Sequence, residues 1–383
     1  MDCRLAHLAK KVVVIGGTGH VGSYLIPRLA ASPAYEVICV SRGKAKPYPA
    51  GCQDSKPDQR WDQVRRMVID RDSAGFYTAI AAMRPDVVID MVCFTLAQCK
   101  ELVNALLPLR NVQLIHTGSI WAYGPTVATP TTEDGPHGEP LAEYGRCKRE
   151  IANYLLDLIG PASQLQRVVF HPGHICGRGW PPLNPQGNFD PRVFDRLRRG
   201  ETVALPNLGM ESVHHVHADD IASAFIAAIE KPDVCNGEVF NIVSPQALTL
   251  RRFAEKITAE IWPREAPPPP TLQFVPLPAD ISQRSAFEST CDGPASVELS
   301  FEHIRHSPCC SVDKLHRILG VRPKWSSLAA VADAVRWMDE QGVMETIAFP
   351  GQDTRPPLAG AGQKRDRNDA DVTSRGNRAY SEE

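Results

Sequence analysis

The sequence lacks a strong net charge of either sign. Its 383 residues include 42 Lys and Arg against 44 Asp and Glu, which gives a formal net charge of -2. Proteins that bind nucleic acid or anionic membranes through charge usually carry a basic excess, so neither partner is indicated. The sequence also lacks an apolar run of about 18 residues, the length that a helix needs to span a bilayer. We therefore expect no membrane association and no nucleic-acid partner.

Signals for secretion and for metal binding are missing too. The first residues, MDCRLAHLAKK, have no apolar core and no cleavage site, so a cytoplasmic location is expected. The 11 cysteines form no CxxC pair and show no other metal-ligand spacing. We interpret them as reduced thiols, and we expect no metal site.

The composition is sufficient for a large hydrophobic core. Apolar residues make up 43% of the chain and charged residues 22%, which excludes wholesale disorder. In the first half, short apolar runs alternate with helical patterns. This alternation is typical of an α/β, Rossmann-type, doubly wound parallel sheet with both faces covered by crossover helices. The expected strands are residues 12–15, 36–40, 66–69, 86–92, 112–116 and 167–171, and the expected helices are 20–31, 76–83, 97–107 and 144–158.

The second half is less regular, and it suggests a small C-terminal substrate-binding lobe. We predict a dinucleotide-binding Rossmann core at 10–176, to which 213–245 returns, and a lobe made of 177–212 and 246–345. Residues 351–383 contain almost no large apolar side chains, so we predict a disordered tail. The expected strands here are 213–217 and 238–243, and the expected helices are 193–199, 219–230, 250–262, 311–319 and 328–341.

A glycine-rich loop gives the strongest local signal. Gly16, Gly19 and Gly22 directly follow the first predicted strand and open a helix. The first glycine allows a tight turn, the second lets a pyrophosphate approach the backbone, and the third lets helix and strand pack closely. The helix N-terminus then supplies amides and a positive dipole end. The sequence therefore predicts a dinucleotide site, whose other loop residues are Thr18, His20 and Val21.

The end of the second predicted strand bears on the choice of cofactor. An acid at this point would bind the ribose 2′-hydroxyl of NAD, but the strand ends in Ser41 and Arg42. A guanidinium can pair with a 2′-phosphate, so NADP is favoured over NAD. Asp70, at the end of the third strand, could receive the adenine amine. An ordinary strand-end carboxylate is an equally good interpretation of Asp70.

Three residues form a possible catalytic set. Tyr144 and Lys148 share one face of a predicted helix, and Ser119 follows the fifth strand at the edge where parallel sheets bind ligands. A phenol with a pKa of about 10 is a poor base at neutral pH, and a nearby ammonium lowers that pKa. Tyr144 would exchange a proton with a substrate oxygen while hydride moves to or from a nicotinamide. Ser119 would hydrogen-bond the same oxygen.

Together these motifs resemble an extended short-chain dehydrogenase/reductase and, more narrowly, the NAD-dependent epimerase/dehydratase family. The resemblance covers about residues 10–342 and includes the glycine loop, the strand-end serine before a YG pair, YxxxK, HPGHICGRG, VHHVHADDIASAF and GEVFNI. It implies an enzyme that acts on a small molecule, in which Lys148 also holds the nicotinamide ribose. It further implies a homodimer formed through the helix that carries Tyr144.

The chain departs from this family on the substrate side. Ile120 and Trp121 stand where sugar 4,6-dehydratases have an Asp-Glu pair, so elimination of water is rejected. Val213 takes the place of an arginine that binds the pyrophosphate in nucleotide-sugar epimerases, and His171 replaces a second arginine. Nucleotide-sugar binding is therefore in question. Arginines that could compensate are Arg178, Arg192 and Arg196.

Aromatic and histidine side chains are the remaining candidates for the substrate site. We predict that Trp121, His171 and His174 line it. The histidines at 214, 215 and 217 suggest a metal, but no nearby Cys or Glu completes a typical ligand set. Pocket-lining or hydrogen-bonded histidines are therefore the preferred interpretation.

Several functions stay open at this point. The main prediction is an NAD(P)-dependent oxidoreductase or epimerase that acts on a secondary alcohol or ketone. A nucleotide-sugar 4-epimerase with tightly bound NAD is one alternative. Another is a non-catalytic protein that binds RNA or senses a cofactor, since SRGKAKPY and NPQGNFDP resemble epimerase-like proteins that include chloroplast stem-loop RNA-binding proteins. A pure binder, however, has no need of Ser119, Tyr144 and Lys148.

Overall fold

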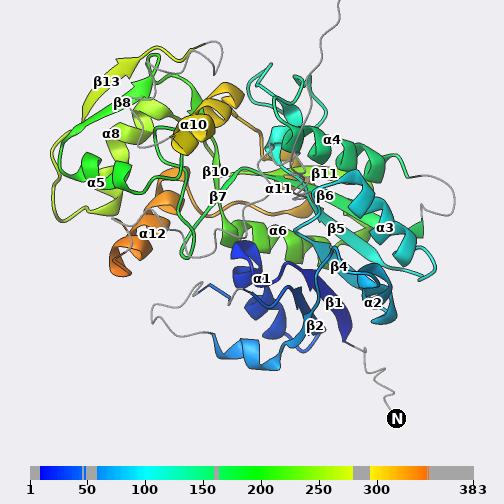
Figure 1. The fold of residues 1–383 in the computed structure, drawn as a ribbon. Helices are drawn as coiled ribbons and strands as arrows, with labels where there is room; N and C mark the ends of the chain where they lie inside the picture. Colours follow the sequence, from blue (N-terminus) through cyan, green and yellow to red (C-terminus); the bar gives the residue numbers. More distant parts are fainter. Residues whose placement is uncertain are drawn as a thin grey trace, which may run out of the picture.

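A seven-stranded sheet forms the centre of the molecule. The computed structural model describes residues 9–44, 47–48, 58–158, 164–278, 294–342 and 344. The strand order is β11-β6-β5-β4-β1-β2-β3, and every neighbouring pair is parallel (Figure 1). The predicted α/β fold with a doubly wound parallel sheet is confirmed. The strands are β1 (Lys10–Ile15), β2 (Tyr35–Ser41), β3 (Arg65–Val68), β4 (Val87–Asp90), β5 (Gln113–Thr117), β6 (Gln166–Pro172) and β11 (Glu238–Ile242).

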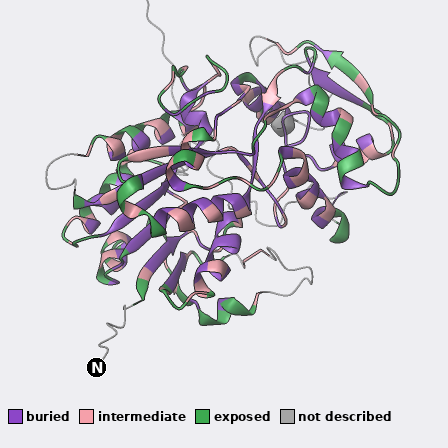
Figure 2. Ribbon diagram, turned by 180° about the vertical axis from the view of Figure 1, so that it is seen from behind, coloured by how far each residue is buried: buried purple, intermediate pink, exposed green. Residues whose placement is uncertain are grey.

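Helices cover both faces of this sheet. Because β1 and β4 are buried on both sides, their sequences are continuous apolar runs rather than alternating ones. Figure 2 shows the buried strands between helices whose outer sides are exposed. On one face lie α1 (His20–Ala30), α6 (Ala218–Glu230) and α11 (Asp313–Leu319); on the other lie α2 (Phe76–Ala82), α3 (Leu96–Leu106) and α4 (Glu143–Leu156).

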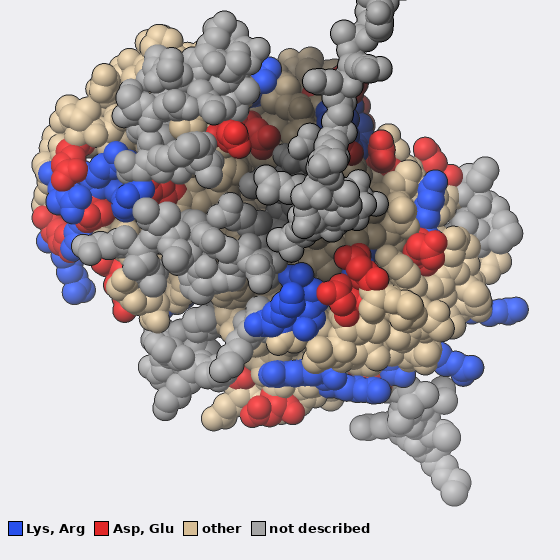
Figure 3. All heavy atoms as spheres, viewed as in Figure 1, with Lys and Arg blue, Asp and Glu red and all other residues tan. Residues whose placement is uncertain are grey.

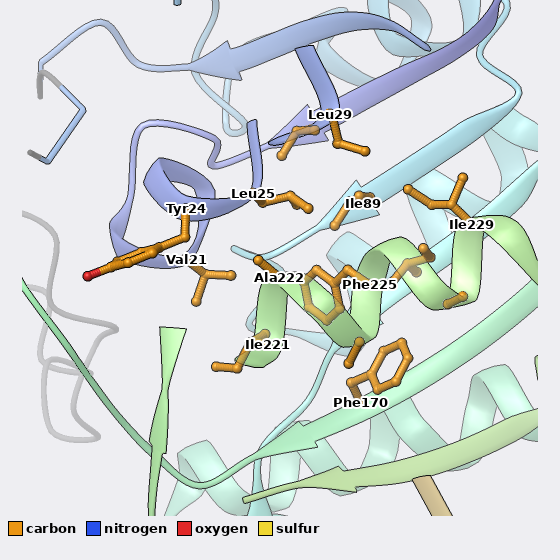
Figure 4. Packing of buried hydrophobic residues seen from close by; sticks show 14 of the residues in the cluster. Val21, Tyr24, Leu25, Leu29, Ile89, Phe170, Ile221, Ala222, Phe225 and Ile229 are labelled. Atoms are coloured by element: carbon orange, nitrogen blue, oxygen red, sulfur yellow. The ribbon is translucent and has the colours of Figure 1, made fainter. Parts of the chain in front are cut away.

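The packing of α1 against α6 fixes the helix that begins at the glycine loop. Leu25 and Leu29 lie one turn apart, so both point from α1 toward the sheet (Figure 4). They share one buried cluster with Phe225 of α6, Ile89 of β4 and Phe170 of β6, and all five side chains are fully buried. Each contributes about 1.5–3 kcal/mol through removal of apolar surface from water. The N-terminus of α1 is thereby held rigidly beside the end of β1.

A second hydrophobic core lies in a lobe at the left of Figure 1. Its helix α8 (Leu250–Ile261) buries Phe253, Ile257 and Ile261, which recur at helical spacing on one face. Two parallel strands, β7 (His174–Cys176) and β10 (His215–His217), carry the chain between the sheet and this lobe. The other lobe elements are α5 (Arg192–Arg198), β8 (Thr202–Pro206), β13 (Thr271–Val275), α10 (Pro294–His306) and α12 (Ser327–Glu340).

The lobe differs from the sequence prediction in two respects. The single strand expected at 213–217 is split into β9 (Ser212–Val213), which pairs antiparallel with β12 (Leu248–Thr249), and β10, which pairs parallel with β7; His214 lies between the two. Its Nδ1 accepts from the Cys310 N–H, and its Nε2 bonds the Ser244 carbonyl. The sequence also gave no indication of β8, β13 or α10. The segment 351–383, for which a disordered tail was predicted, lies outside the described residues.

The visible surface carries both signs of charge. On the face drawn in Figure 3, Lys and Arg groups lie beside Asp and Glu groups rather than in one continuous patch of a single sign. Among the described residues, no helix is long and apolar enough to cross a membrane.

Candidate active site

The glycine loop lies where the strand order reverses. β1 pairs with β2 on one side and with β4 on the other, and the crevice at such a reversal is the usual ligand site of doubly wound sheets. Gly16 has φ +85° and lies so close to β4 that a Cβ would come within 2.7 Å of Val92. At Gly22 a Cβ would lie 2.2 Å from the Gly17 carbonyl oxygen. Both positions therefore require glycine.

The N-terminus of α1 is shaped for an anion. Gly19 is its N-cap, and no side chain caps the helix. A Cβ on Gly19 would meet only the Gly16 carbonyl oxygen, at 3.2 Å, so the other side of this glycine is open. Uncapped amides and the helix dipole make this a suitable cradle for the phosphates of a dinucleotide. Thr18 precedes Gly19 in the loop, and Val21 is buried in the core beside the sheet.

The side chain of His20, the first residue of α1, contacts the segment that leads into the lobe. Its Nε2 bonds the Arg178 carbonyl at 3.1 Å, and its ring stacks on Trp180 with 6.1 Å between centroids. Burial lowers the pKa of His20 to about 3, so the imidazole is neutral at physiological pH. His20 thus joins the loop to the segment that leads into the lobe.

The residues expected at the adenosine end occupy the ends of β2 and β3. Ser41 is the last residue of β2 and its Oγ accepts from the Gly43 N–H at 3.3 Å, while Arg42 is exposed. Asp70 is exposed as well, and its carboxylate accepts from the Asp72 N–H at 3.1 Å. All three lie at the carboxyl edge of the sheet, on the same edge as the glycine loop.

Ser119, Tyr144 and Lys148 come together beyond β5. Lys148 is only 1% exposed, and its Nζ donates to the carbonyls of Cys93 and Thr117 at 2.8 Å each. The Tyr144 ring centroid lies 5.7 Å from this Nζ, and Tyr144 shares a hydrogen bond with the Ser119 side chain. The two strand-end carbonyls therefore fix the ammonium, and α4 places the phenol one turn away from it.

The pKa of Tyr144 differs from the sequence-based expectation. Burial raises it to about 12, and the hydrogen bond with Ser119 offsets only part of this rise. The sequence led us to expect a pKa of Tyr144 below its ordinary value, but in the arrangement observed desolvation dominates and the pKa lies above that value. Burial also lowers the pKa of Lys148 to about 8. At neutral pH the phenol is protonated and is a proton donor.

His171 contacts the main chain of Ser119. Its Nδ1 accepts from the Ser119 N–H at 2.9 Å, and a Cβ on Gly118 would come within 2.4 Å of the same ring nitrogen. The Ser119 Oγ in turn accepts from the Trp121 N–H at 3.2 Å. The contacts of His171 are thus those of a residue that positions Ser119, rather than the substrate-lining contacts that the sequence suggested.

Sequence reasoning missed a buried ion pair beside this set. Arg71 Nη2 lies 2.6 Å from Asp90 Oδ2, and both side chains are buried. Arg71 also lies over the Phe76 ring, at 5.4 Å from its centroid. The Asp90 carboxylate raises the pKa of Lys148 and so opposes part of the effect of burial. The only feature of the sequence that pointed to this ion pair is the acid at the end of DVVID, which is Asp90.

Trp121 connects Tyr144 to a group of histidines. The Trp121 ring is 5.9 Å from Tyr144, and it stacks on His306 with 4.4 Å between centroids and 9° between planes. His303 lies 4.9 Å from Trp121 and 5.2 Å from His174. The sequence predicted Trp121 and His174 at this place but missed the two residues from α10. Their spacing in FEHIRH shows one helix face, but nothing local indicates where that face packs.

Comparison with known proteins identifies the family. A model of the NAD dependent epimerase/dehydratase family matches residues 12–243. The chain belongs to this family. It is 26% identical over 256 residues to 2'-dehydrokanamycin reductase of Streptomyces kanamyceticus. This alignment covers 67% of this chain and 68% of the relative. It is 24% identical over 329 residues to the chloroplast stem-loop binding protein of 41 kDa b of Arabidopsis thaliana, covering 85% and 78%.

Solved structures of the family have the same fold. UDP-glucuronic acid 4-epimerase from Bacillus cereus, in complex with UDP-glucuronic acid and NAD, aligns with a TM-score of 0.59 at 14% identity. The alignment covers 86% of this chain and 99% of the epimerase chain. The predicted family, an enzyme of the epimerase/dehydratase type, is thus confirmed.

Val213 stands where nucleotide-sugar epimerases of the family carry a pyrophosphate-binding arginine, and this position is not accessible to a ligand. Val213 is fully buried in the lobe core. The arginines considered as substitutes already have partners. Arg178 pairs with Glu340, Arg192 with Asp190 at 2.9 Å, and Arg196 donates to Gln186 at 3.4 Å.

No metal centre is formed by the part of the chain that the structure describes: it contains no group of three or more His, Cys, Asp or Glu side chains able to hold an ion. His215 and His217 contact different neighbours, since His217 stacks on Trp325 at 4.1 Å and His215 lies 5.9 Å from His174.

Proposed function

We propose that the protein is an NAD(P)-dependent oxidoreductase that interconverts a ketone and a secondary alcohol. The observation that carries the proposal is the buried Lys148 ammonium, held by two main-chain carbonyls one turn from the protonated phenol of Tyr144. Burying a charge in this way is costly, and a protein that merely binds a ligand gains nothing from it. Perturbed groups of this kind are characteristic of catalytic sites.

The chain's own residues account for the proton transfer. When bound, the nicotinamide supplies or accepts the hydride. In the direction of reduction, Ser119 hydrogen-bonds the carbonyl oxygen, and the Tyr144 hydroxyl donates its proton to that oxygen as the carbon gains hydride. The products are the alcohol and a phenolate, which the neighbouring Lys148 ammonium stabilises until a proton returns from solvent. His171 holds the Ser119 main chain during this step.

Residues along the carboxyl edge of the sheet would hold the dinucleotide. The cradle at Gly19 would receive the pyrophosphate, and Lys148 would also hold the nicotinamide ribose. Ser41 and Arg42 would lie at the 2′-position of the adenosine ribose, which favours NADP over NAD. Asp70 remains a candidate for the adenine amine. The lobe that contains α5, α8, α10 and α12 would lie over the substrate.

A nucleotide-sugar 4-epimerase with retained NAD is the second candidate, favoured by the family membership and by the NAD-bound relative of the same fold. The two candidates differ in cofactor exchange. We expect purified protein to release little nucleotide on denaturation and to bind added NADPH reversibly. Stoichiometric NAD released on denaturation, together with interconversion of UDP-glucose and UDP-galactose, would favour the epimerase instead.

The catalytic assignment is tested by Tyr144→Phe. Oxidation of NADPH or NADH is followed by absorbance with a panel of cyclic and acyclic ketones. We expect kcat to fall by about 10²–10⁴-fold, because the proton donor is lost, while cofactor affinity and the circular dichroism spectrum are retained. Tyr154→Phe, on the same helix but beside Lys100, is the matched control and should keep wild-type rates. Equal activity in both variants would contradict the role of Tyr144.

A further inference from the structure

The histidines beside Trp121 contain buried ring nitrogens that no protein atom satisfies. Both nitrogens of His174, Nδ1 of His215 and Nε2 of His306 are buried and have no hydrogen-bond partner. The three rings come from β7, β10 and α10, and each is at least nine-tenths buried. Leaving a buried polar atom unpaired costs about 1–3 kcal/mol, so native proteins rarely do it without a reason.

The rings that carry these nitrogens belong to one contiguous group of ring contacts that extends to Tyr144. His174 lies 5.9 Å from His215 and 5.2 Å from His303, measured between ring centroids. Trp121 then joins this group to Tyr144 and stacks on His306. A substrate that receives hydride beside Tyr144 and extends past Trp121 would meet the unsatisfied imidazoles.

The charge of the group restricts what it can bind. Burial lowers the pKa of His215 and of His303 to about 4 and lowers that of His174 well below its usual range. Neutral imidazoles each offer one donor and one acceptor, which suits hydroxyl groups and gives no net charge to balance a phosphate. The arginines of α5 are also engaged within the lobe: Arg192 with Asp190, Arg198 with Glu265, and Arg199 with Asp195 and Glu201.

We propose that His174, His215 and His306 form a subsite for the hydroxyl groups of an uncharged polyhydroxylated substrate, such as a keto-glycoside without a nucleotide. This proposal rests on the proposed oxidoreductase function and names its substrate class. The aromatic rings of Trp121 and Phe189, which borders His303 at 5.5 Å, would supply the apolar walls beside these polar groups. Nucleotide-linked sugars would be poor substrates, since the neutral imidazoles carry no charge for the pyrophosphate and the arginines named above are held by carboxylates.

The test removes ring nitrogens and keeps the rings. His306→Phe and His174→Phe are compared with wild type for NADPH oxidation by methyl glycosides that carry a ketone at C2, C3 or C4. Cyclohexanone serves as the probe without hydroxyls, and UDP-4-keto-6-deoxyglucose as the nucleotide-linked one. We expect wild type to have its lowest KM with one of the keto-glycosides. In each variant, the KM for that glycoside should rise about 5- to 100-fold more than the KM for cyclohexanone, with a smaller change in kcat.

Several outcomes would overturn the proposal. A merely structural role, or occupancy by water alone, would lower thermal stability and shift KM for both ketones equally. Preference for the UDP-linked ketone would contradict the substrate class. His316→Gln, on α11 and away from the group, is the control and should match wild type. If one Phe variant fails to fold, as judged by circular dichroism and NADPH binding, the other gives the answer.

A binding measurement separates this inference from the proposed function. Saturation-transfer NMR with the unoxidised methyl glycosides requires no turnover and detects weak binding. Contacts that appear with wild type and vanish in His174→Phe would support the subsite even if no ketone were reduced, a result that would refute only the oxidoreductase. Reduction of cyclohexanone without any glycoside binding would support the oxidoreductase and refute the subsite.

Discussion

The proposed catalytic groups and the neighbouring histidines are buried to a similar degree, but they differ in how many of their polar atoms are hydrogen-bonded to protein. Lys148 donates to two carbonyls, and Ser119 is held through both its N–H and its Oγ. In contrast, His174 has no partner on either ring nitrogen. The difference indicates that the chemistry is arranged by the fold in advance, whereas recognition of the substrate is completed only by the ligand.

The same contrast separates the sheet from the lobe. The sheet's ligand edge is set by backbone geometry, at the glycine loop and at the strand-end carbonyls, and such geometry varies little once the core is packed. In the lobe, the ligand edge is made of side chains from strands and a helix that are distant in sequence. Family members can therefore share the first region and differ in the second.

The largest expected effect is a loss of NADPH affinity when the glycine loop is substituted, which tests whether this edge of the sheet is shaped in advance. Gly22→Ala would place a methyl 2.2 Å from the Gly17 carbonyl oxygen. Overpacking of this kind costs about 1–3 kcal/mol, so NADPH affinity should fall roughly 5- to 150-fold, as measured by fluorescence titration. The matched control is Gly75→Ala, where φ is +85° but no atom lies within 4 Å. It should lower stability by about 1–2 kcal/mol and keep NADPH affinity. If Gly22→Ala bound NADPH normally, the loop would not be pre-shaped.

The second effect is a change in kcat/KM of about tenfold per pH unit, caused by the titration of Lys148. Since its pKa is about 8 in the folded protein, the ammonium is lost as pH rises through that value. We expect kcat/KM for ketone reduction to decline above about pH 8, while Tyr144 stays protonated until about pH 12.

Stability should move in the opposite direction over the same range. The unfolded lysine has a pKa of about 10.4, so between pH 8 and that value the unfolded state binds more protons. The contribution of Lys148 to stability therefore rises with pH in this window. Thermal unfolding at each pH distinguishes a loss of the ammonium from a loss of the fold. A kcat/KM that stays constant to pH 10 would contradict the assignment.

The smallest expected effect is on binding of the 2′-phosphate at the adenosine ribose of the cofactor. Arg42 is exposed, so a charge pair with a 2′-phosphate should contribute about 1 kcal/mol. Arg42→Ala is expected to weaken NADPH binding about fivefold and to leave NADH binding unaffected. The control is Arg110→Ala, an exposed arginine after α3. If both dinucleotides were affected equally, the preference for NADP would have to be assigned to other residues.

Much of the fold could be predicted because its signals are local. The strand that ends at Ile15, the glycines that follow it and the YxxxK spacing each depend on residues close together in the chain. Their mutual arrangement then follows from the rule that parallel strands present their carboxyl ends at one edge. Ser119 and Lys148 were found in this way.

The remaining features depend on packing between distant segments. Nothing in FEHIRH shows that His306 stacks on Trp121, because the two residues are far apart in the chain. Likewise the raised pKa of Tyr144 results from burial, which the sequence pattern does not give. Residues 212–217 form two short strands because one half pairs with Leu248–Thr249 and the other with His174–Cys176, segments that are distant in the chain.

Isotope transfer tests the central claim most directly. The protein is incubated with NADPH deuterated at the reactive C4 position and with the ketone panel, and the alcohols are analysed by mass spectrometry. The account predicts one deuterium on the carbinol carbon with wild type and with Tyr154→Phe, and almost none with Tyr144→Phe. Alcohol formed without deuterium, or deuterium transfer undiminished in Tyr144→Phe, would contradict it.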